Sequence, residues 1–253
     1  MLRINDLSFS YPNGERILEN VNIEISQNGV YSIIGLNGAG KSTLLKLCAS
    51  ILRPELGSIE LDGRDISKIS YRELSRVRSY LPQNVFLPVD FPVIDFIKYG
   101  AYLDMDIFSR VGKEREAEIE KIMAEMNILH LRKRMTSSLS AGEMQRIHIA
   151  KGLVQGGKII LMDEPVSTID VSFRRKFALM LKKLRSERII LLVTHDLQLA
   201  FGLSERIISL RAGKVISDDK PDEAIKQINE VYGENIGFIN HKGRYIFTDE
   251  EEM

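Results

Sequence analysis

A glycine-rich segment that ends in a lysine and a serine is the first group of residues whose types and spacing could do chemistry. Its pattern is G-x-x-x-x-G-K-[ST]. Glycines let successive backbone N–H groups turn toward phosphate oxygens, and a following helix adds its positive N-terminal end. Lys41 can neutralise the β- and γ-phosphates of a nucleotide, and the Ser42 hydroxyl can ligate Mg²⁺. The predicted nucleotide-binding residues are Gly35, Leu36, Asn37, Gly38, Ala39, Gly40, Lys41, Ser42 and Thr43.

Two adjacent acids, Asp163 and Glu164, follow an apolar run over 158–162 that is predicted to be a buried strand. Such strand ends line the ligand crevice of an open α/β sheet. Asp163 is predicted to hold Mg²⁺, largely through water, and Glu164 to polarise the attacking water. Glu164 can act as a base only if it has no permanent cationic partner. A solvated strand end is the alternative interpretation, and the phosphate loop favours the catalytic one.

A second capped helix start lies between these two motifs. Ser140 and Glu143 have the S-x-x-E spacing of a capping box and precede an apolar run over 147–153. The simplest interpretation is a well-capped helix. A serine hydroxyl, Gly142 and a helix N-terminus also make a second anion site, with no phosphate loop attached to it.

The apolar patterns predict an α/β framework that positions these residues. The first 25 residues alternate as strands around a turn at Tyr11–Gly14, and a short apolar run over 30–34 precedes the phosphate loop. A helix-like pattern over 114–129 indicates a helical insert that begins near Gln83. Later strand-like runs alternate with helical stretches, which argues for a mostly parallel sheet. The runs are 58–62, 78–81, 158–162, 188–193 and 206–210, and the helical stretches are 171–184 and 197–203.

The composition is that of an ordinary globular protein, with 253 residues, 44% hydrophobic and 28% charged. Lys plus Arg equals Asp plus Glu at 35 each, so no net field favours nucleic acid as a partner. Cys48 is the single cysteine, which excludes an intrachain disulfide and suits a reducing compartment. We expect no signal peptide and no membrane-spanning segment, because the apolar runs are short.

The segment Leu139-Ser140-Ala141-Gly142-Glu143 resembles the L-S-G-G-Q signature of the ABC ATPase family, and the resemblance covers nearly the whole chain. In that family the signature of one cassette binds the γ-phosphate held by the phosphate loop of another. The resemblance therefore implies that Ser140, Gly142 and Glu143 close on ATP across a dimer. Ala141 and Glu143 depart mildly from the signature, and these departures could change the affinity of closure.

Four other positions match the family one at a time. Tyr11 stands where an aromatic ring stacks on adenine, although a turn tyrosine packed on the sheet is the alternative. Gln83 resembles the glutamine that reaches Mg²⁺ and water and whose loop faces the membrane partner. Asp170 matches a loop that crosses between the cassettes. His195 matches the γ-phosphate histidine, although a lone histidine is more often structural.

The resemblance implies an α/β fold: a P-loop NTPase core with a mostly parallel sheet, an N-terminal antiparallel β subdomain and an inserted helical subdomain. Residues 1–83 and 156–220 would form the core, 84–155 the helical signature subdomain and 221–253 a C-terminal tail, within one ABC ATPase domain. ATP and Mg²⁺ would be the ligands. The expected partners are a second copy, packed head to tail, membrane permease subunits and a substrate-binding protein, with no nucleic acid. The expected location is peripheral, on the cytoplasmic face of the cell membrane.

Three other classes of nucleotide-binding protein fit the sequence less well than a transporter ATPase does. DNA-repair or chromosome-organising ABC ATPases carry a long coiled coil between phosphate loop and signature, whereas only about a hundred residues without sustained heptads separate Lys41 from Ser140 here. Translation-associated ABC proteins carry two cassettes in one chain, and this sequence has one. A GTPase would need an N-K-x-D motif, which this sequence lacks. The basic runs 132–134 and 174–176 are predicted to be solvated helix faces. Residues 194–200, 221–224 and 230–233 resemble the corresponding stretches of importers of iron chelates, haem and cobalamin. Residues 99–102 lack the G-R-x-P-H stretch often found there, so an exporter subunit stays open.

Overall fold

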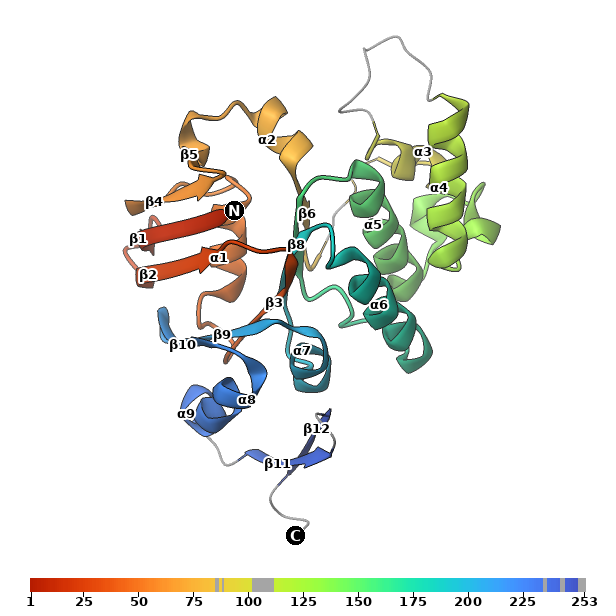
Figure 1. The fold of residues 1–253 in the computed structure, drawn as a ribbon. Helices are drawn as coiled ribbons and strands as arrows, with labels where there is room; N and C mark the ends of the chain where they lie inside the picture. Colours follow the sequence, from red (N-terminus) through yellow and green to blue (C-terminus); the bar gives the residue numbers. More distant parts are fainter. Residues whose placement is uncertain (85–86, 88, 102–111, 234–235, 242–243, 250–253) are drawn as a thin grey trace.

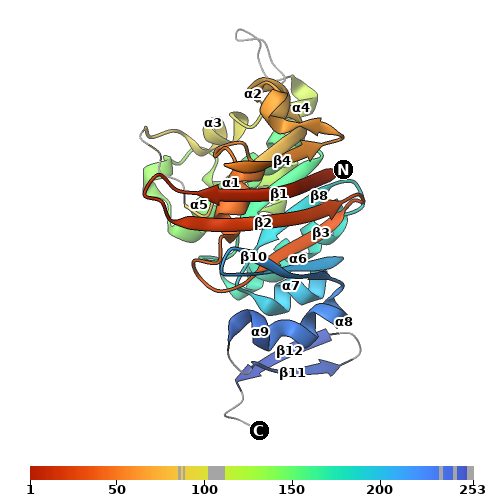
Figure 2. The same ribbon diagram turned by 90° about the vertical axis from the view of Figure 1, so that its left-hand side faces the viewer.

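The computed structural model of the chain describes residues 1–84, 87, 89–101, 112–233, 236–241 and 244–249. A central sheet separates two differently built regions (Figure 1). An antiparallel sheet and helix α1 lie on one side, and a group of helices lies on the other. The C-terminal tail extends from the end of the molecule near β9, β10 and α7, as the view in Figure 2 also shows.

The N-terminal sheet is antiparallel and has the strand order β2-β1-β4-β5. Alternating apolar residues of β1 and β2 pair across the two strands, for example Leu2 with Ile25 and Ile4 with Ile23, and all four are buried. The predicted strand alternation is therefore confirmed. The bounds are β1, Leu2–Ser10; β2, Arg16–Ile25; β4, Leu56–Leu61; β5, Arg64–Asp65.

The central sheet has six strands in the order β10-β9-β3-β8-β7-β6, and all neighbours except β10 and β9 run parallel. Strands β7 and β8 are buried along their whole length, as expected for a sheet covered on both faces. The mostly parallel sheet is thus confirmed. The bounds are β3, Gly29–Ile34; β6, Arg78–Leu81; β7, Ile159–Asp163; β8, Ile189–Val193; β9, Arg206–Arg211; β10, Lys214–Asp219.

Four helices connect these strands. Helix α1 (Lys41–Cys48) follows β3, and α2 (Tyr71–Val77) precedes β6 after the short 3₁₀ helix η1 (Ile66–Lys68). Helices α6 (Val171–Leu184) and α7 (Leu197–Leu203) have the bounds predicted from the sequence. Each of the last two begins at an aspartate whose side chain accepts a hydrogen bond from a backbone N–H of the first turn.

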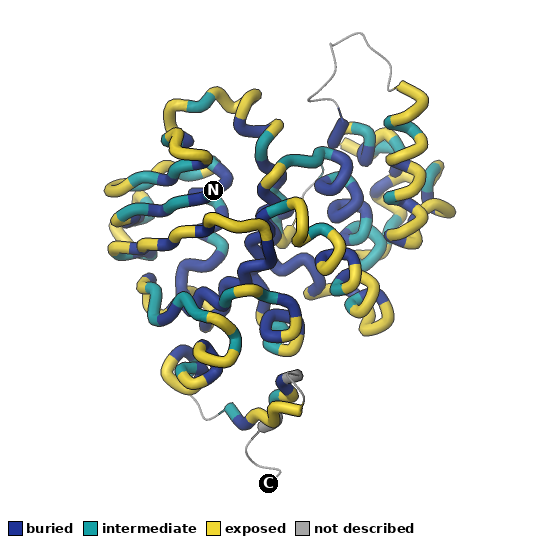
Figure 3. The backbone as a smooth tube through the Cα atoms, viewed as in Figure 1, coloured by how far each residue is buried: buried dark blue, intermediate teal, exposed yellow. Residues whose placement is uncertain are grey.

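The predicted helical insert consists of α3 (Val93–Lys98), α4 (Lys113–Glu125) and α5 (Ala141–Gln155), with 3₁₀ helices η3 (Leu129–Leu131) and η4 (Thr136–Ser138). Their buried faces form one apolar cluster that continues to the central sheet, and buried positions appear in dark blue in Figure 3. Helix α4 ends at Glu125, before the predicted end at residue 129. The prediction that 132–134 lies on a helix face is wrong, because these residues form a turn after η3. The run 174–176 does lie on α6.

The tail contains α8 (Pro221–Ala224), η5 (Ile225–Gln227), α9 (Ile228–Tyr232) and an antiparallel hairpin of β11 (Ile236–His241) and β12 (Arg244–Asp249). The predicted hairpin is confirmed, although its expected turn at Lys242-Gly243 lies outside the described residues, as does most of the acidic end over 249–252. Phe201 of α7 packs edge-on against Tyr245, with ring centroids 5.3 Å apart. Among the residues that the structure describes, no helix is long and apolar enough to cross a membrane.

Candidate functional site

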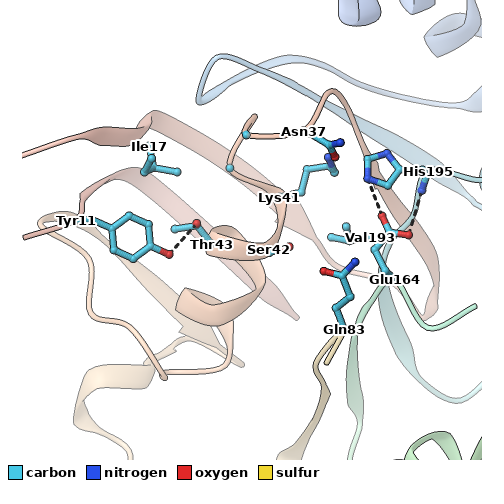
Figure 4. A pocket seen from close by; sticks show the side chains of 12 residues that line it. Tyr11, Ile17, Asn37, Lys41, Ser42, Thr43, Gln83, Glu164, Val193 and His195 are labelled. Atoms are coloured by element: carbon cyan, nitrogen blue, oxygen red, sulfur yellow. Dashed lines mark hydrogen bonds and ion pairs between the residues drawn. The ribbon is translucent and has the colours of Figure 1, made fainter. Parts of the chain in front are cut away.

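The phosphate loop opens on a cavity of about 290 Å³ at the carboxyl ends of the parallel strands. Figure 4 shows its side chains converging from β2, the loop, α1 and the ends of β6, β7 and β8. Most of the lining side chains are polar, and Ile17 and Val193 contribute apolar groups on different sides of the cavity. The lining residues are Tyr11, Ile17, Asn37, Gly38, Gly40, Lys41, Ser42, Thr43, Gln83, Glu164, Val193 and His195.

Gly40 lets the loop turn sharply into α1. Its φ is +100°, which side chains rarely tolerate, and a Cβ would lie 3.0 Å from Ile17 O and 2.6 Å from Leu18 Cδ2, so a larger residue would be strained here. Lys41 follows as the first residue of the helix and is buried. Its Nζ donates hydrogen bonds to Gly35 O and Leu36 O, both at 2.8 Å. Burial lowers the Lys41 pKa, against the opposing effect of Glu164 and Asp163. The ammonium is therefore held over the loop by the loop's own carbonyls.

Ser42 lines the cavity and contacts Asp163, which is buried and is not itself part of the lining, although the two residues are far apart in sequence. Ser42 Oγ donates a hydrogen bond to Asp163 Oδ1 at 2.9 Å. Asp163 ends β7 and pairs in register with Val193 of β8, which fixes its backbone. Burial raises the Asp163 pKa, whereas the Ser42 hydrogen bond lowers it. A hydroxyl oxygen beside a carboxylate oxygen is the kind of donor set that Mg²⁺ prefers, completed by phosphate oxygens and water.

Glu164 is aimed into the cavity by an unusual backbone conformation. Its φ is +49°, rare for a residue with a Cβ, and its N–H donates to Val193 O at 3.0 Å. Its Oε1 lies 3.2 Å from His195 Nε2, and its Oε2 accepts from the His195 N–H at 3.4 Å. Burial raises the pKa of Glu164 to about 7. Burial and the nearby charge of Lys41 lower the pKa of His195. The imidazole is therefore neutral at pH 7, and the partner of Glu164 is no permanent cation.

Tyr11 and Gln83 border the cavity from opposite sides (Figure 4). The Tyr11 hydroxyl lies 3.3 Å from Thr43 Oγ1, and its ring packs edge-on against Phe9. Gln83 is exposed and follows β6 by two residues. Sequence reasoning missed the two apolar lining residues, Ile17 and Val193. Only the strand-end position of Val193 offered a signal.

The signature segment begins α5 with the predicted capping box. Ser140 N and Ser140 Oγ donate to Glu143 Oε2 at 2.8 and 2.9 Å, and Glu143 N donates back to Ser140 Oγ at 3.3 Å. Ser140 is exposed, and Gly142 is half-buried. None of Ser140, Gly142, Glu143 and Asp170 belongs to the lining of the cavity. The structure therefore gathers most of the predicted site in one place but leaves the second anion site on its own surface.

Asp170 caps α6 and joins it to the signature helix. Its Oδ1 accepts from the Phe173 N–H at 2.9 Å, and its Oδ2 forms an ion pair with Arg146 of α5. Hydrogen bonds from Ser172 and the Phe173 backbone hold the Asp170 pKa at about 2. The Arg146 guanidinium also lies over the Phe173 ring, 4.6 Å from its centroid. The arginine was not predicted as a site residue, and its link to Asp170 ties the two surface motifs together.

Comparison with known proteins gives the class of this site. The family model of the ABC transporter matches residues 18–167. The ferric enterobactin transport ATP-binding protein FepC of Escherichia coli (strain K12) is 34% identical over 86% of this chain and 82% of its own. The phosphonates import ATP-binding protein PhnC 2 of Synechococcus sp. is 32% identical over 92% of this chain and 91% of its own.

Among solved structures, the dimeric post-hydrolysis state of the ATP-binding cassette MJ0796 with ADP and Pi is 26% identical over 87% of this chain and 99% of that one, with a TM-score of 0.78. The chain belongs to the ABC transporter family. Within that family it is an ATP-binding and ATP-hydrolysing subunit, and its fold is the P-loop α/β fold expected from the sequence.

Proposed function

We propose that this protein powers an ABC importer by closing two copies, head to tail, over two ATP molecules. The observation that carries the proposal is the separation of two anion sites on one chain. The phosphate loop gathers Lys41, Ser42 and Glu164 into a cavity, whereas the capped N-terminus at Ser140 lies outside that lining. A second copy can supply the missing donors from the Ser140 hydroxyl and the Gly142 backbone.

Each residue of the cavity has a role in this proposal. Lys41 leaves the Gly35 and Leu36 carbonyls to hold the β- and γ-phosphates. Ser42 and Asp163 hold Mg²⁺, with Gln83 reaching it from the edge of the cavity. Bound Mg²⁺ would neutralise phosphate charge and so favour displacement at the γ-phosphorus.

Glu164 orients the attacking water and accepts its proton, for which a pKa of about 7 is suited. The His195 backbone N–H donates to Glu164 Oε2 and so orients the carboxylate without a permanent counter-charge. His195 is half exposed, with 47% of its side chain accessible, and its ring can reach the γ-phosphate from the end of β8. Tyr11 offers its ring to the adenine.

We also propose the division of the chain into a core (1–83 and 156–220), a helical signature subdomain (84–155) and a tail (221–253). Gln83 stands where core and helical subdomain meet. Val89 and Tyr99, on the helical side, are large apolar side chains that are 56% and 47% exposed. We expect this region to contact permease subunits, which would place the protein at the cytoplasmic face of the cell membrane.

The proposed cargo is an iron chelate or a related compound such as haem or cobalamin, delivered by a substrate-binding protein. Support comes from the sequences of residues 194–200, 221–224 and 230–233, and from the similarity to the ferric enterobactin ATP-binding protein. The similarity to the phosphonates import protein makes phosphonate the second candidate.

An uptake assay in the native host tests this proposal. A strain without the gene is complemented with wild type or with Glu164→Gln, and uptake of a ⁵⁵Fe-labelled chelate and of a labelled phosphonate is measured. We expect the wild-type gene, but not the Glu164→Gln gene, to restore iron uptake. The two complemented strains should take up phosphonate equally. Restored phosphonate uptake would assign the other cargo. If the deletion strain accumulated labelled compound and the wild-type gene reversed this accumulation, the protein would belong to an exporter and the proposal would be contradicted.

A further inference from the structure

Another cavity, of about 110 Å³, lies between strand β6 and the signature helix α5, which are neighbours in Figure 1. Helix α5 packs closely on the strand here, because a Cβ at Gly152 would lie 2.6 Å from Leu81 Cδ1. The lining consists of residues from both elements and of Pro82, which directly precedes Gln83. The cavity therefore lies beside the segment that we expect to face permease subunits.

Lys151 of α5 gives this cavity its charge. Its side chain is half-buried and lies over Phe96 of α3, with Nζ 5.1 Å from the ring centroid. Among the residues that the structure describes, Lys151 has no ion pair and its ammonium makes no hydrogen bond. Burial lowers its pKa, and no described carboxylate opposes this effect. A partly buried cation without a counter-charge costs free energy, of which a ring contact recovers only a part.

The other polar side chains of the lining do not supply a counter-charge. His148 packs edge-on against Phe96, with ring centroids 5.0 Å apart. Burial and the charge of Lys151 lower the His148 pKa to about 4, so its ring is neutral at pH 7. Gln155 donates its side-chain amide to backbone carbonyls of α2 and β6. Within the described lining, Lys151 is thus a single cation, and a single cation matches a singly charged anion.

We propose that this cavity receives a carboxylate side chain of a permease subunit, with Lys151 as its counter-charge. The proposal rests on the proposed function and names the chemistry of the expected permease contact. A Cβ at Gly100 would lie 2.4 Å from Lys151 O, so the end of α3 lies directly against α5 here. Tyr99, the residue before Gly100, exposes 47% of its surface. A large exposed aromatic residue beside an unpaired cation favours a protein partner that carries an acidic side chain.

Carbodiimide cross-linking of membranes from the native host tests the contact. The reagent joins an amine to a carboxylate where the two groups touch, and mass spectrometry identifies the joined peptides. We expect Lys151 to be joined to an Asp or Glu of an integral-membrane protein. Lys151 joined to any other carboxylate, or left unjoined while other lysines of the membrane-bound chain react, would overturn the inference.

Rebinding of the purified chain to membranes of the deletion strain gives the strength of the contact. Lys151→Met should weaken half-saturation of these membranes roughly tenfold or more, because the permease carboxylate loses its counter-charge. Lys151→Arg keeps the charge and should stay within about threefold of wild type. Lys183→Met is the matched control, because Lys183 is exposed on α6 and lies outside this cavity. The control should stay within about twofold.

The purified chain alone separates docking from folding. Lys151 does not line the nucleotide site, so Lys151→Met should leave the ATPase rate of the free chain within about twofold. Its free energy of unfolding should not fall, because the substitution removes an unpaired cation. Unchanged membrane binding by Lys151→Met, or weaker binding matched by lower stability, would overturn the inference and leave the proposed function standing. Failure of the wild-type chain to bind these membranes would overturn both.

Discussion

His195 Nε2 lies 3.2 Å from Glu164 Oε1, and the His195 backbone N–H donates to the other oxygen of the same carboxylate at 3.4 Å. His195, two residues after β8, therefore contacts the carboxylate that follows β7 with both its ring and its main chain, and the main-chain N–H makes the hydrogen bond. Since the two strands are parallel neighbours, this relationship is fixed by the sheet register. It orients the proposed base while leaving it free of a permanent counter-charge.

Replacing Glu164 by Gln should separate binding from hydrolysis. The amide keeps the size of the side chain but cannot accept the proton of the attacking water. We expect ATP affinity to stay within about threefold and the hydrolysis rate to fall by a factor on the order of 10²–10⁴. Phosphate release under single-turnover conditions, beside equilibrium ATP binding, measures both. Near-normal turnover would remove Glu164 from the mechanism.

The same substitution predicts a pH-dependent change in stability. The Glu164 pKa is about 7 in the folded chain against an ordinary value of 4.5, so between these pH values the folded state keeps a proton that the unfolded state releases. Wild type therefore loses stability as pH rises through this window. Glu164→Gln avoids this loss and should be more stable by about 1–3 kcal/mol above pH 7.5, with the difference vanishing near pH 4.5. Urea unfolding at several pH values measures it, and a pH-independent difference would contradict the assigned cause.

Glu143 should weaken closure of the dimer. Its carboxylate accepts both Ser140 hydrogen bonds and lies 3.7 Å from Arg134, yet it would also face the γ-phosphate of a partner's ATP. Glu143→Gln removes this repulsion and should tighten ATP-dependent dimerisation by up to about tenfold at low salt, and less at high salt.

Sedimentation of the Glu164→Gln protein with ATP measures the effect of Glu143. Glu73→Gln is a matched control, because Ser70 and Glu73 form the same capping box at the start of α2. An equal response of the two variants would show a general effect of charge rather than a contact with nucleotide.

Tyr11 should contribute to nucleotide affinity through its ring and not its hydroxyl. Tyr11→Leu should weaken ATP binding roughly three- to tenfold, the range of one aromatic stacking contact, whereas Tyr11→Phe should stay close to wild type. Tripolyphosphate carries no adenine, so its affinity should not respond to either change. Equal losses for ATP and tripolyphosphate in Tyr11→Leu would assign the ring to packing of the loop instead.

Local patterns were sufficient to predict most of the framework and the centre of the site. The apolar run before Asp163 predicts a buried strand, and the capping box of Ser140 and Glu143 predicts the start of α5, because both signals are local in sequence. The contacts that depend on distant strands could not be predicted. Ile17 borders the cavity only because β2 passes Gly40, and Tyr232 packs against the cluster that contains Ile34 only because the tail folds against β3. The turn at 132–134 was wrongly predicted as helical, since charge alone does not distinguish a turn from a solvated helix face.

The most direct test of the account is a cross-link between the two anion sites. Ser140→Cys and Asn37→Cys are made in separate Glu164→Gln chains, mixed, and treated with a short bifunctional thiol reagent. Both positions are exposed, whereas native Cys48 is buried, with its pKa raised to about 12, and should not react. Ser186→Cys, exposed at the opposite edge of the sheet, replaces Ser140→Cys as the control. We predict a cross-linked heterodimer of the Ser140→Cys and Asn37→Cys chains that forms with ATP and not without it. Absence of this product from chains shown to have bound ATP would contradict the claim that two copies grip each nucleotide.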